Sequence, residues 1–546
     1  MLQIGKSLAL IFFVMALYIA PAFAATSIPF TINMSKAVNV TGTPRIAVDV
    51  GGVTRYATYT SGTGTAALIF TYTMVAGDVD LDGVTVSSPI DLNGGTIKDL
   101  AGNDLSPLTF TLPNTSNVKV NYPSLGMDFI YDADGRYTLN GTVYNDLTSF
   151  LTAAGGTFSR TSIGTYFDSA GVLQTAASGV PRFDYDPITH VAKGILMEES
   201  RANLLLNSAA LNLWNTTNTT MTANTTSAPD GTISADTWTR NSTASSYIGQ
   251  TYTKAASAIT YTQTVYAKQN VSNYVAIRMQ GLYPARADMV ANLNTGTIST
   301  AATVASGFTT ASGSIQNVGN GWYRLTLTAT TDTDTSVRMY ISFNSGGGVL
   351  DATDTVSNSS GYLWGAQLEQ ASSASSYIPT TTATVTRAID VLSIPTGGWF
   401  SGATGTIIGR AQVPSLTQTD FGATLFNFND NTSANYIWGF MRANGSGQTR
   451  GEVVTAAASV GSFLGSNSFA INTPSTIGIA YQNSNFAFSA KGASLLTSGA
   501  GNVPTVNKLN IGSRETGASN RFNGNIAMIK YYPLRASNTQ LQLMTQ

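Results

Sequence analysis

Tyr323-Arg-Leu-Thr-Leu-Thr-Ala329 is the stretch that decides the fold, because its side chains alternate between apolar and polar. A period of two is typical of a strand with one face in a core and the other in solvent. The same kind of short run recurs along the chain: Arg45–Val50, Ala67–Thr73, Tyr261–Ala267 and Ser336–Phe343. Turn formers such as Asn140-Gly141 separate such runs, since Gly and Asn tolerate a positive φ. The sequence therefore predicts an all-β protein built from serial β-sandwiches. Helical patterns are limited to two short candidates, residues 145–153 and 203–211.

The composition of the chain narrows the classes of function. Its 546 residues include 28 basic and 29 acidic side chains, one histidine, His190, and no cysteine. Histidine titrates nearest neutrality and cysteine is the readiest nucleophile, so an enzyme built here would depend on carboxylates and hydroxyls. The net charge of −1 shows no basic excess of the kind that nucleic acid attracts. We therefore expect a protein that is not an enzyme and does not bind nucleic acid.

The N-terminus has the features of a secretory signal peptide. Lys6 precedes an apolar run from Leu8 to Ala20, and Ala22-Phe-Ala24 supplies small residues at the two positions that a signal peptidase reads. The apolar run is shorter than the ~20 residues that span a bilayer. We expect residues 1–24 to be a cleaved signal peptide. The mature protein is then secreted or at the cell surface, without insertion into the membrane.

Residues 25–120 form the first predicted domain. Val40-Thr-Gly-Thr-Pro-Arg-Ile-Ala-Val-Asp-Val-Gly-Gly52 and Asn93-Gly-Gly-Thr-Ile-Lys-Asp-Leu-Ala-Gly-Asn103 resemble bacterial Ig-like repeats, which occur in large secreted and surface proteins. The resemblance implies an Ig-like β-sandwich that acts as a spacer or contact surface, more than it implies a particular ligand.

Three carboxylates within this domain, at Asp78, Asp80 and Asp82, stand two residues apart before Gly83. Oxygen-rich loops of this spacing can hold calcium. The twelfth position of an EF-hand loop, which requires a bidentate glutamate, would be Pro89, so that motif is excluded. Two interpretations stay open: a weak calcium site and a solvated acidic hairpin loop.

Residues 121–208 carry a different pattern. Val180-Pro-Arg-Phe-Asp-Tyr-Asp-Pro187 and Gly194-Ile-Leu-Met-Glu-Glu-Ser-Arg-Ala-Asn-Leu-Leu205 resemble a segment that recurs in phage head-spike and tail-fibre proteins. We interpret it as a connecting segment between domains. The charged residues of these two quoted stretches are Arg182, Asp184, Asp186, Glu198, Glu199 and Arg201. They could form an acid/base pair, but we favour buried ion pairs that fix an interdomain junction, because unpaired charges are costly to bury.

Residues 209–392 are similar to carbohydrate-binding jelly-roll modules that also occur in phage tail proteins. The similarity is carried by Gly321-Trp-Tyr-Arg-Leu-Thr-Leu327, Tyr362-Leu-Trp-Gly-Ala-Gln-Leu-Glu369, Tyr377-Ile-Pro-Thr380 and Thr386-Arg-Ala-Ile-Asp390. The resemblance implies glycan recognition, for which aromatic rings offer flat apolar faces to sugars. The candidate rings are Trp238, Tyr247, Tyr252, Tyr274 and Tyr283. We expect Trp322 and Trp364 to lie in the core instead.

Residues 393–546 resemble laminin-G and concanavalin-A-like sandwiches. The similarity rests on Gly405-Thr-Ile-Ile-Gly-Arg-Ala411 and Phe522-Asn-Gly-Asn-Ile-Ala-Met-Ile-Lys-Tyr-Tyr-Pro-Leu-Arg535. Glucanases of this fold place acids alternately on one strand. The acids here are each isolated in sequence: Asp420, Asp430, Glu452 and Glu515. Hydrolysis is therefore disfavoured, although isolated acids can converge in three dimensions.

Three functional hypotheses follow from these patterns. The first is a secreted, non-catalytic, modular surface or fibre-like protein that binds glycans or another extracellular polymer in adhesion. The second is a structural subunit of an extracellular assembly, a homotrimer by analogy with phage fibres. The third is a polysaccharide hydrolase, which would need two carboxyl groups about 5 to 10 Å apart in an aromatic-lined cleft. Calcium is the one cofactor that the sequence suggests.

Overall fold

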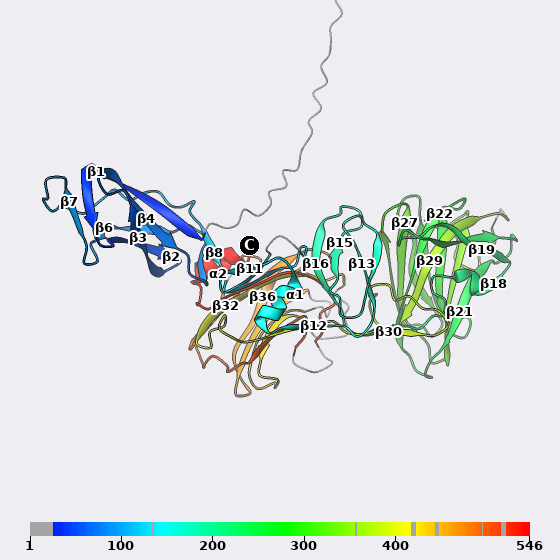
Figure 1. Ribbon diagram of the computed structural model, residues 1–546. Helices are drawn as coiled ribbons and strands as arrows, with labels where there is room; N and C mark the ends of the chain where they lie inside the picture. The colour runs from blue at the N-terminus through cyan, green and yellow to red at the C-terminus, as the bar shows by residue number, and fades with distance from the viewer. Residues whose placement is uncertain are drawn as a thin grey trace, which may run out of the picture. The chain divides into compact units, whose positions relative to one another are not determined.

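The computed structural model describes residues 26–132, 136–354, 357–415, 422–442, 447–493, 495–514 and 520–546 (Figure 1). The predicted signal peptide, residues 1–24, lies outside them, as do Asp420 and Glu515. Strands make up most of the regular structure, which confirms the all-β fold. The α-helices within the described ranges are α1 (Leu147–Ala154) and α2 (Asn538–Met544), and neither has the length and hydropathy of a membrane-spanning segment.

Of the two predicted helices, only the first is present. Helix α1 matches the prediction for residues 145–153, and Asp146 caps it by accepting a hydrogen bond from the Ser149 amide at 2.7 Å. The prediction for residues 203–211 is wrong. Asn203 ends a strand, and its side-chain amide donates to the carbonyls of Ala366 and Ile378 across the domain. These bonds keep the start of the segment from forming a helix, and a short 3₁₀ turn follows at Leu211–Leu213.

The chain divides into two compact units. The first takes in residues up to 49, with 54–74 and 85–113. Its strands pair in the order β6-β2-β3-β4-β1-β7. The long strand β1 pairs with β4 up to Asn33 and, after an irregularity, again at Val38, from which it also pairs with β7. The bounds are β1 (Ser27–Thr41), β2 (Arg45–Val50), β3 (Val53–Ser61), β4 (Thr65–Thr73), β6 (Thr85–Asp91) and β7 (Thr96–Asp99).

The second unit takes in residues 50–53, 75–84 and 114–546. Its largest core lies between a ten-stranded and a seven-stranded antiparallel sheet. The ten-stranded sheet contains β9 (Leu125–Asp128), β10 (Tyr137–Leu139), β11 (Thr142–Tyr144), β15 (Phe183–Tyr185), β16 (Ala192–Met197), β32 (Thr404–Gln412), β37 (Ser475–Gln482), β38 (Asn485–Ala490), β39 (Leu496–Ser498) and β41 (Gly524–Tyr532). The seven-stranded sheet contains β12 (Thr157–Ser159), β31 (Val391–Pro395), β33 (Ala423–Asn429), β34 (Tyr436–Arg442), β35 (Gln448–Thr455), β36 (Ala458–Ser468) and β40 (Lys508–Ile511).

This sandwich takes strands from two distant parts of the sequence. Strand β41 pairs with β32 along one edge, and with both β16 and β9 along the other. Strand β12 extends the seven-stranded sheet by pairing with β31. The segment interpreted from its sequence as a connection therefore also supplies strands to the C-terminal sandwich.

A second sandwich, between residues 215 and 369, has two six-stranded antiparallel sheets. One contains β18 (Asn215–Thr217), β21 (Tyr247–Thr253), β23 (Tyr274–Gln280), β24 (Arg286–Asn292), β25 (Thr297–Ala305) and β28 (Ser336–Asn344). The other contains β19 (Thr219–Ser227), β20 (Ile233–Arg240), β22 (Thr260–Gln269), β26 (Thr310–Asn317), β27 (Trp322–Thr330) and β29 (Ser360–Glu369). Alternate residues of β27, including Leu325 and Leu327, are buried in the core between the sheets, as the period of two predicts.

Three two-stranded pairs complete the second unit. They are β13 (Gly164–Phe167) with β14 (Leu173–Ala176), β17 (Arg201–Asn203) with β30 (Val385–Arg387), and β5 (Asp78–Asp80) with β8 (Val120–Tyr122). The β13–β14 hairpin is the one that bears on function, because its side chains form one wall of a pocket.

Candidate functional site

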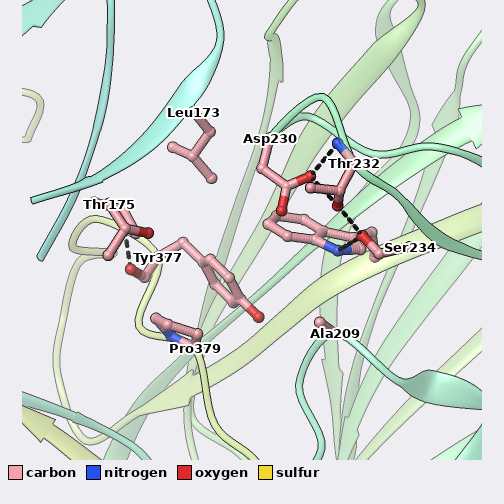
Figure 2. Close-up of a pocket in the computed structure, with 10 residues that line it drawn as sticks. Leu173, Thr175, Ala209, Asp230, Thr232, Ser234, Tyr377 and Pro379 are labelled. Carbon is pink, nitrogen blue, oxygen red and sulfur yellow. Dashed lines mark hydrogen bonds between the residues drawn. The ribbon is translucent and has the colours of Figure 1, made fainter. Parts of the chain in front are cut away.

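A cavity of about 230 Å³ lies between the β13–β14 hairpin and residues of the 215–369 sandwich with its flanking segments (Figure 2). Figure 2 shows Leu173 and Thr175 on the hairpin side, facing Asp230, Thr232 and Ser234. The full lining is Thr165, Leu173, Thr175, Ala209, Asp230, Thr232, Ser234, Trp364, Tyr377 and Pro379. Thr175 and Thr232 are exposed, so the cavity opens to solvent between them.

Two aromatic rings give the cavity its apolar surface. Trp364 on β29 and Tyr377 in the following segment have ring centroids 4.8 Å apart, at an interplanar angle of 51°. Tyr266 on β22 packs against both of them edge-on, with centroid distances of 5.5 Å and 6.2 Å. Trp364 and Tyr377 are almost fully buried, at 3% and 2% exposed, so they present edges to the cavity and are held rigidly. Burial raises the pKa of the Tyr377 phenol, which therefore stays neutral.

A chain of hydrogen bonds crosses the polar wall. The indole Nε1 of Trp364 donates to Ser234 Oγ at 3.0 Å, and Ser234 Oγ lies 2.7 Å from Thr232 Oγ1. Thr232 donates to Asp230 Oδ1 twice, from its hydroxyl at 2.7 Å and from its amide at 2.9 Å. Because Oδ1 takes both bonds, the turn at Asp230-Gly-Thr232 is fixed while Oδ2 has no hydrogen-bond partner in the described part of the chain.

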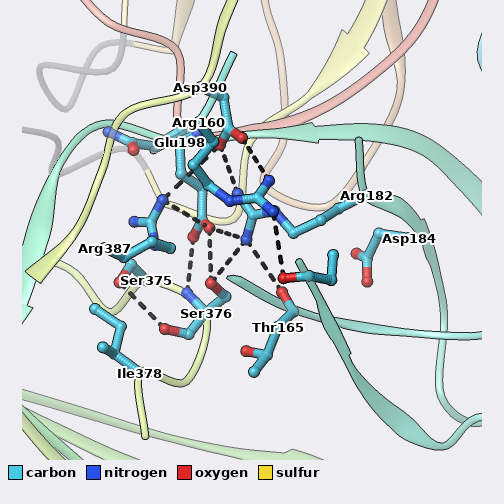
Figure 3. Close-up of polar contacts among 12 residues, drawn as sticks. Arg160, Thr165, Arg182, Asp184, Glu198, Ser375, Ser376, Ile378, Arg387 and Asp390 are labelled. Atoms are coloured by element: carbon cyan, nitrogen blue, oxygen red, sulfur yellow. Dashed lines mark hydrogen bonds and ion pairs between the residues drawn. The ribbon is translucent and has the colours of Figure 1, made fainter. Parts of the chain in front are cut away.

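A buried cluster of charges holds both walls of this cavity in place (Figure 3). Arg182 donates to Glu198 Oε2 at 2.6 Å and to Asp390 Oδ2 at 2.5 Å. The same guanidinium donates to the carbonyl of Thr165, in the hairpin wall. Glu198 accepts at 2.7 Å from the amide of Ser376, the residue before Tyr377. The cluster therefore positions Thr165 and Tyr377 relative to each other.

Two further arginines complete this cluster. Arg160 Nη1 lies 3.1 Å from Asp390 Oδ1, and Arg387 Nη1 lies 3.2 Å from Glu198 Oε2. All five charged side chains are at most 5% exposed. Burial opposes the ionisation of Glu198, but the charges of Arg387 and Arg182 outweigh it and lower its pKa to about 2. The prediction of buried ion pairs is thus confirmed for Arg182 and Glu198.

The other charged residues of the two stretches quoted from this segment have partners outside the cluster. Asp184 meets Lys193, and Glu199 meets Arg201. Asp186 instead accepts the amides of Ile188 and Thr189 in a turn.

The five aromatic residues singled out from the sequence do not line this cavity. Trp238 is fully buried and packs against Phe343, with centroids 5.5 Å apart, so its ring offers no face to a ligand. Tyr252 packs against Tyr261 on the core side.

The remaining three lie on or near the sheet that contains β21, which is also the sheet of Tyr252. Half-buried Tyr247 packs against Tyr340 at 4.9 Å. Tyr274 is also half-buried, at the start of β23. Tyr283 is 61% exposed in the loop after β23, where Arg286 lies 5.5 Å from its ring centroid. The structure therefore does not bring the five rings together.

The three aspartates proposed for calcium are engaged with hydrogen-bond donors. Asp78 accepts the amide of Val75, and Asp80 accepts the amides of Gly51 and Gly83 at 2.7 and 2.8 Å. Burial raises the pKa of Asp80 despite these bonds. Exposed Asp82 accepts from the side-chain amide of Gln540. Over the described ranges, no group of three acidic or histidine side chains is arranged to hold a metal ion.

The residues of the cavity were visible in the sequence, but their arrangement was not. Trp322 and Trp364 were predicted to be core residues, and at 1% and 3% exposed they are. What the pattern could not show is that one edge of Trp364 borders a cavity. Asp230-Gly-Thr232 reads as an ordinary turn, and only the fold places its carboxylate beside an aromatic pair.

No protein-family model matches the sequence, and no curated protein matches it significantly. Among solved structures, domain 4 of the extracellular arabinanase AbnA from Geobacillus stearothermophilus aligns at a TM-score of 0.23 and 14% identity, over 32% of this chain and 82% of that one. The CBM40 of the Ruminococcus gnavus IT-sialidase, bound to α2,6-sialyllactose, aligns at 0.22 and 15%, over 27% and 85%. Chicken galectin 2 aligns at 0.19 and 13%, over 26% and 96%. These alignments are partial and their TM-scores are low, so we draw nothing about ligand or activity from them.

Proposed function

We propose that the protein is a secreted, non-catalytic, modular adhesion protein that binds a sugar unit of a glycan in the cavity between the β13–β14 hairpin and the 215–369 sandwich. The observation that carries the proposal is an aromatic pair, Trp364 and Tyr377, beside a carboxylate with one unpartnered oxygen, in a cavity open to solvent. Sugars present C–H faces and hydroxyl edges, and this cavity offers an apolar surface next to a hydrogen-bond acceptor.

The size of the cavity limits how many sugar rings it can hold. Pockets that enclose drug-sized ligands measure about 300–1,000 Å³. At about 230 Å³ the cavity is smaller than these, which suits one terminal sugar ring and not a run of several. Affinity for a single ring is weak, so an adhesion protein of this kind gains strength from several copies acting together.

Binding without cleavage is the form of the proposal that the geometry favours. Glycoside hydrolysis commonly uses two carboxyl groups on opposite sides of the scissile bond. The lining of the cavity includes one carboxylate, Asp230. Calcium at Asp78, Asp80 and Asp82 plays no part in this proposal and stays a separate prediction, testable by whether calcium raises the melting temperature of the full chain.

A glycan array with the intact mature chain tests the proposal. Replacing Thr175 by Tyr fills the mouth of the cavity from the exposed side of β14. We expect Thr175→Tyr to lower retention of the bound glycans at least tenfold. Thr303→Tyr is the matched control, since Thr303 is an exposed strand threonine of the same sandwich that does not line the cavity. Retention that is equal in both variants would place the ligand elsewhere, and no retention by the wild type would refute glycan binding.

A further inference from the structure

The direction of the hydrogen bonds around the cavity can be assigned atom by atom. An indole N–H can only donate, so Ser234 Oγ accepts from Trp364. A carboxylate can only accept, so the Thr232 hydroxyl donates to Asp230 Oδ1. The Thr232 hydroxyl has one proton, and it is used in the hydrogen bond to Asp230. Thr232 Oγ1 must therefore accept a hydrogen bond from Ser234 Oγ, which lies 2.7 Å away. All three hydrogen bonds therefore run in one direction, from Trp364 toward Asp230.

This arrangement leaves the polar wall with acceptors and few donors. The indole N–H and the hydroxyl protons of Ser234 and Thr232 are all used within the protein. The hydroxyl of Thr165 is also used, because it donates to the carbonyl of Tyr377 at 2.6 Å, and the phenol oxygen of Tyr377 lies 2.7 Å from Ser208 Oγ, so it too has a partner within the protein. What is left for a ligand is Asp230 Oδ2, which has no hydrogen-bond partner among the described residues, together with the hydroxyl of exposed Thr175, which can donate or accept.

The charge of the cavity also favours ligands that donate hydrogen bonds. Among its ten lining residues Asp230 is the one charged side chain, and no Lys or Arg belongs to the lining. An anionic substituent on a ligand would meet a negative charge without a cation to offset it. An ammonium or hydroxyl group would instead donate to Oδ2 and gain from that charge.

We infer that the cavity selects for sugar rings that donate hydrogen bonds and carry no acidic group, with Asp230 as the residue that sets this specificity. The inference rests on the proposed glycan binding and deepens it to a ligand class. Neutral sugars bind through their hydroxyls, amino sugars bind more tightly, and uronic acids, sialic acids and sulfated sugars are rejected.

The test uses the intact mature chain on an array of glycans that are matched except for the terminal ring. Glucose and galactose termini are each compared with the corresponding 2-amino sugar and the corresponding uronic acid. The wild type is expected to retain neutral termini about tenfold better than acidic ones, as one charge contact that is largely screened by solvent at the open cavity predicts. Amino termini are expected to exceed both.

Asp230→Asn is the decisive variant, because asparagine keeps the Oδ1 acceptor that fixes the turn and removes the charge. We expect it to bring the retention of neutral, amino and acidic termini to within about threefold of one another, since the charge contact is gone. Asp430→Asn is the matched control. Asp430 Oδ1 accepts from the amide and hydroxyl of Thr432 at 2.9 and 2.6 Å, so the same turn occurs in the other sandwich, away from the cavity lining. That variant should keep the wild-type ranking.

The outcomes separate the two proposals. If the wild type retains no glycan, the proposed function fails. If it retains glycans but holds acidic termini as well as neutral ones, or if Asp230→Asn leaves the ranking unchanged, the charge selectivity is wrong while glycan binding stands.

Discussion

Arg182 has no exposed side-chain surface, yet its guanidinium contacts two carboxylates, a carbonyl and a hydroxyl. Removing Arg182 leaves Glu198 paired with Arg387 and Asp390 paired with Arg160, but it deprives buried acceptors of their donor, which costs about 1–3 kcal/mol. We expect Arg182→Met to destabilise the second unit by this amount, measured by denaturant unfolding. Lys98→Met is the control, because Lys98 pairs with Asp104 at the surface and should change stability little. Equal effects of the two substitutions would contradict the structural role of the cluster.

Glu198 makes the stability of the second unit depend on pH in the acid range. Its folded pKa of about 2 lies below its ordinary value of 4.5, because the charges of Arg387 and Arg182 outweigh the effect of burial. A depressed pKa adds stability that is present above the unfolded value and is lost as pH falls toward the folded one. We expect the melting temperature of the second unit to fall between pH 4.5 and 2. In Glu198→Gln it should be lower at neutral pH and fall less over this window, and an equal fall would contradict the assignment.

The sequence predicted that this cluster would consist of buried ion pairs, but it did not predict which residues would form it. Arg182 and Glu198 were recognisable as partners because they lie in one segment rich in charge. Asp390 was not, because it lies 208 residues from Arg182 and joins it only through the fold. The same holds for the cavity, where Asp230 and Trp364 are brought together by two different strands and a turn.

Among the strands of the C-terminal sandwich, β16 and β41 approach each other very closely. Gly194 in β16 has a φ of +107°, and a Cβ at this position would lie 2.1 Å from the carbonyl oxygen of Ile526 in β41. We expect Gly194→Ala to disrupt this pairing and to lower the melting temperature of the second unit strongly. Gly179→Ala is the control, since Gly179 has a φ of +77° with open space around it and bears only the backbone strain, roughly 1–2 kcal/mol. Equal losses would show that β16 does not pack against β41 this closely.

Helix α1 has two carboxylates at its N-terminus: Asp146 is the N-cap, and Asp132 accepts from the Leu147 amide at 2.6 Å. The carboxylate of Asp146 accepts from the Ser149 amide and from its hydroxyl, and these bonds lower its pKa. We expect Asp146→Ala to destabilise the second unit by about 0.5–2 kcal/mol, measured by thermal unfolding. Asp146→Asn should recover most of this loss, because asparagine is an equally good cap. Failure of Asn to recover it would mean that the charge, and not the cap, matters.

The pattern of alternation predicted most strands but not which strands pair. Strands β27, β28, β32 and β41 coincide, to within a residue or a few at each end, with stretches quoted from the sequence alone. A period of two says which face of a strand is buried, but it does not identify the neighbouring strand. Strands β9, β12 and β16 are short, and each has one partner, β31 or β41, that lies more than 200 residues away. Their place in the C-terminal sandwich could therefore not be predicted.

At the scale of the whole molecule, this shared architecture decides which fragments can fold. Residues 393–546 alone lack β9, β12 and β16, and with them buried core residues such as Leu125, Met127 and Ile195. We expect the 393–546 fragment to give no cooperative melting transition, whereas residues 114–546 give one. Near-ultraviolet circular dichroism during heating checks this. A cooperative, native-like transition in the short fragment would contradict the shared sandwich.

The central proposal is that a sugar binds in the cavity built from the β13–β14 hairpin and the 215–369 sandwich with its flanking segments. A crystal structure of the intact mature chain with the best-retained array glycan tests this most directly. We predict a terminal ring against Trp364 and Tyr377, with a hydroxyl or amino group within hydrogen-bond distance of Asp230 Oδ2. A glycan bound at another surface, with this cavity containing only water, would contradict the claim.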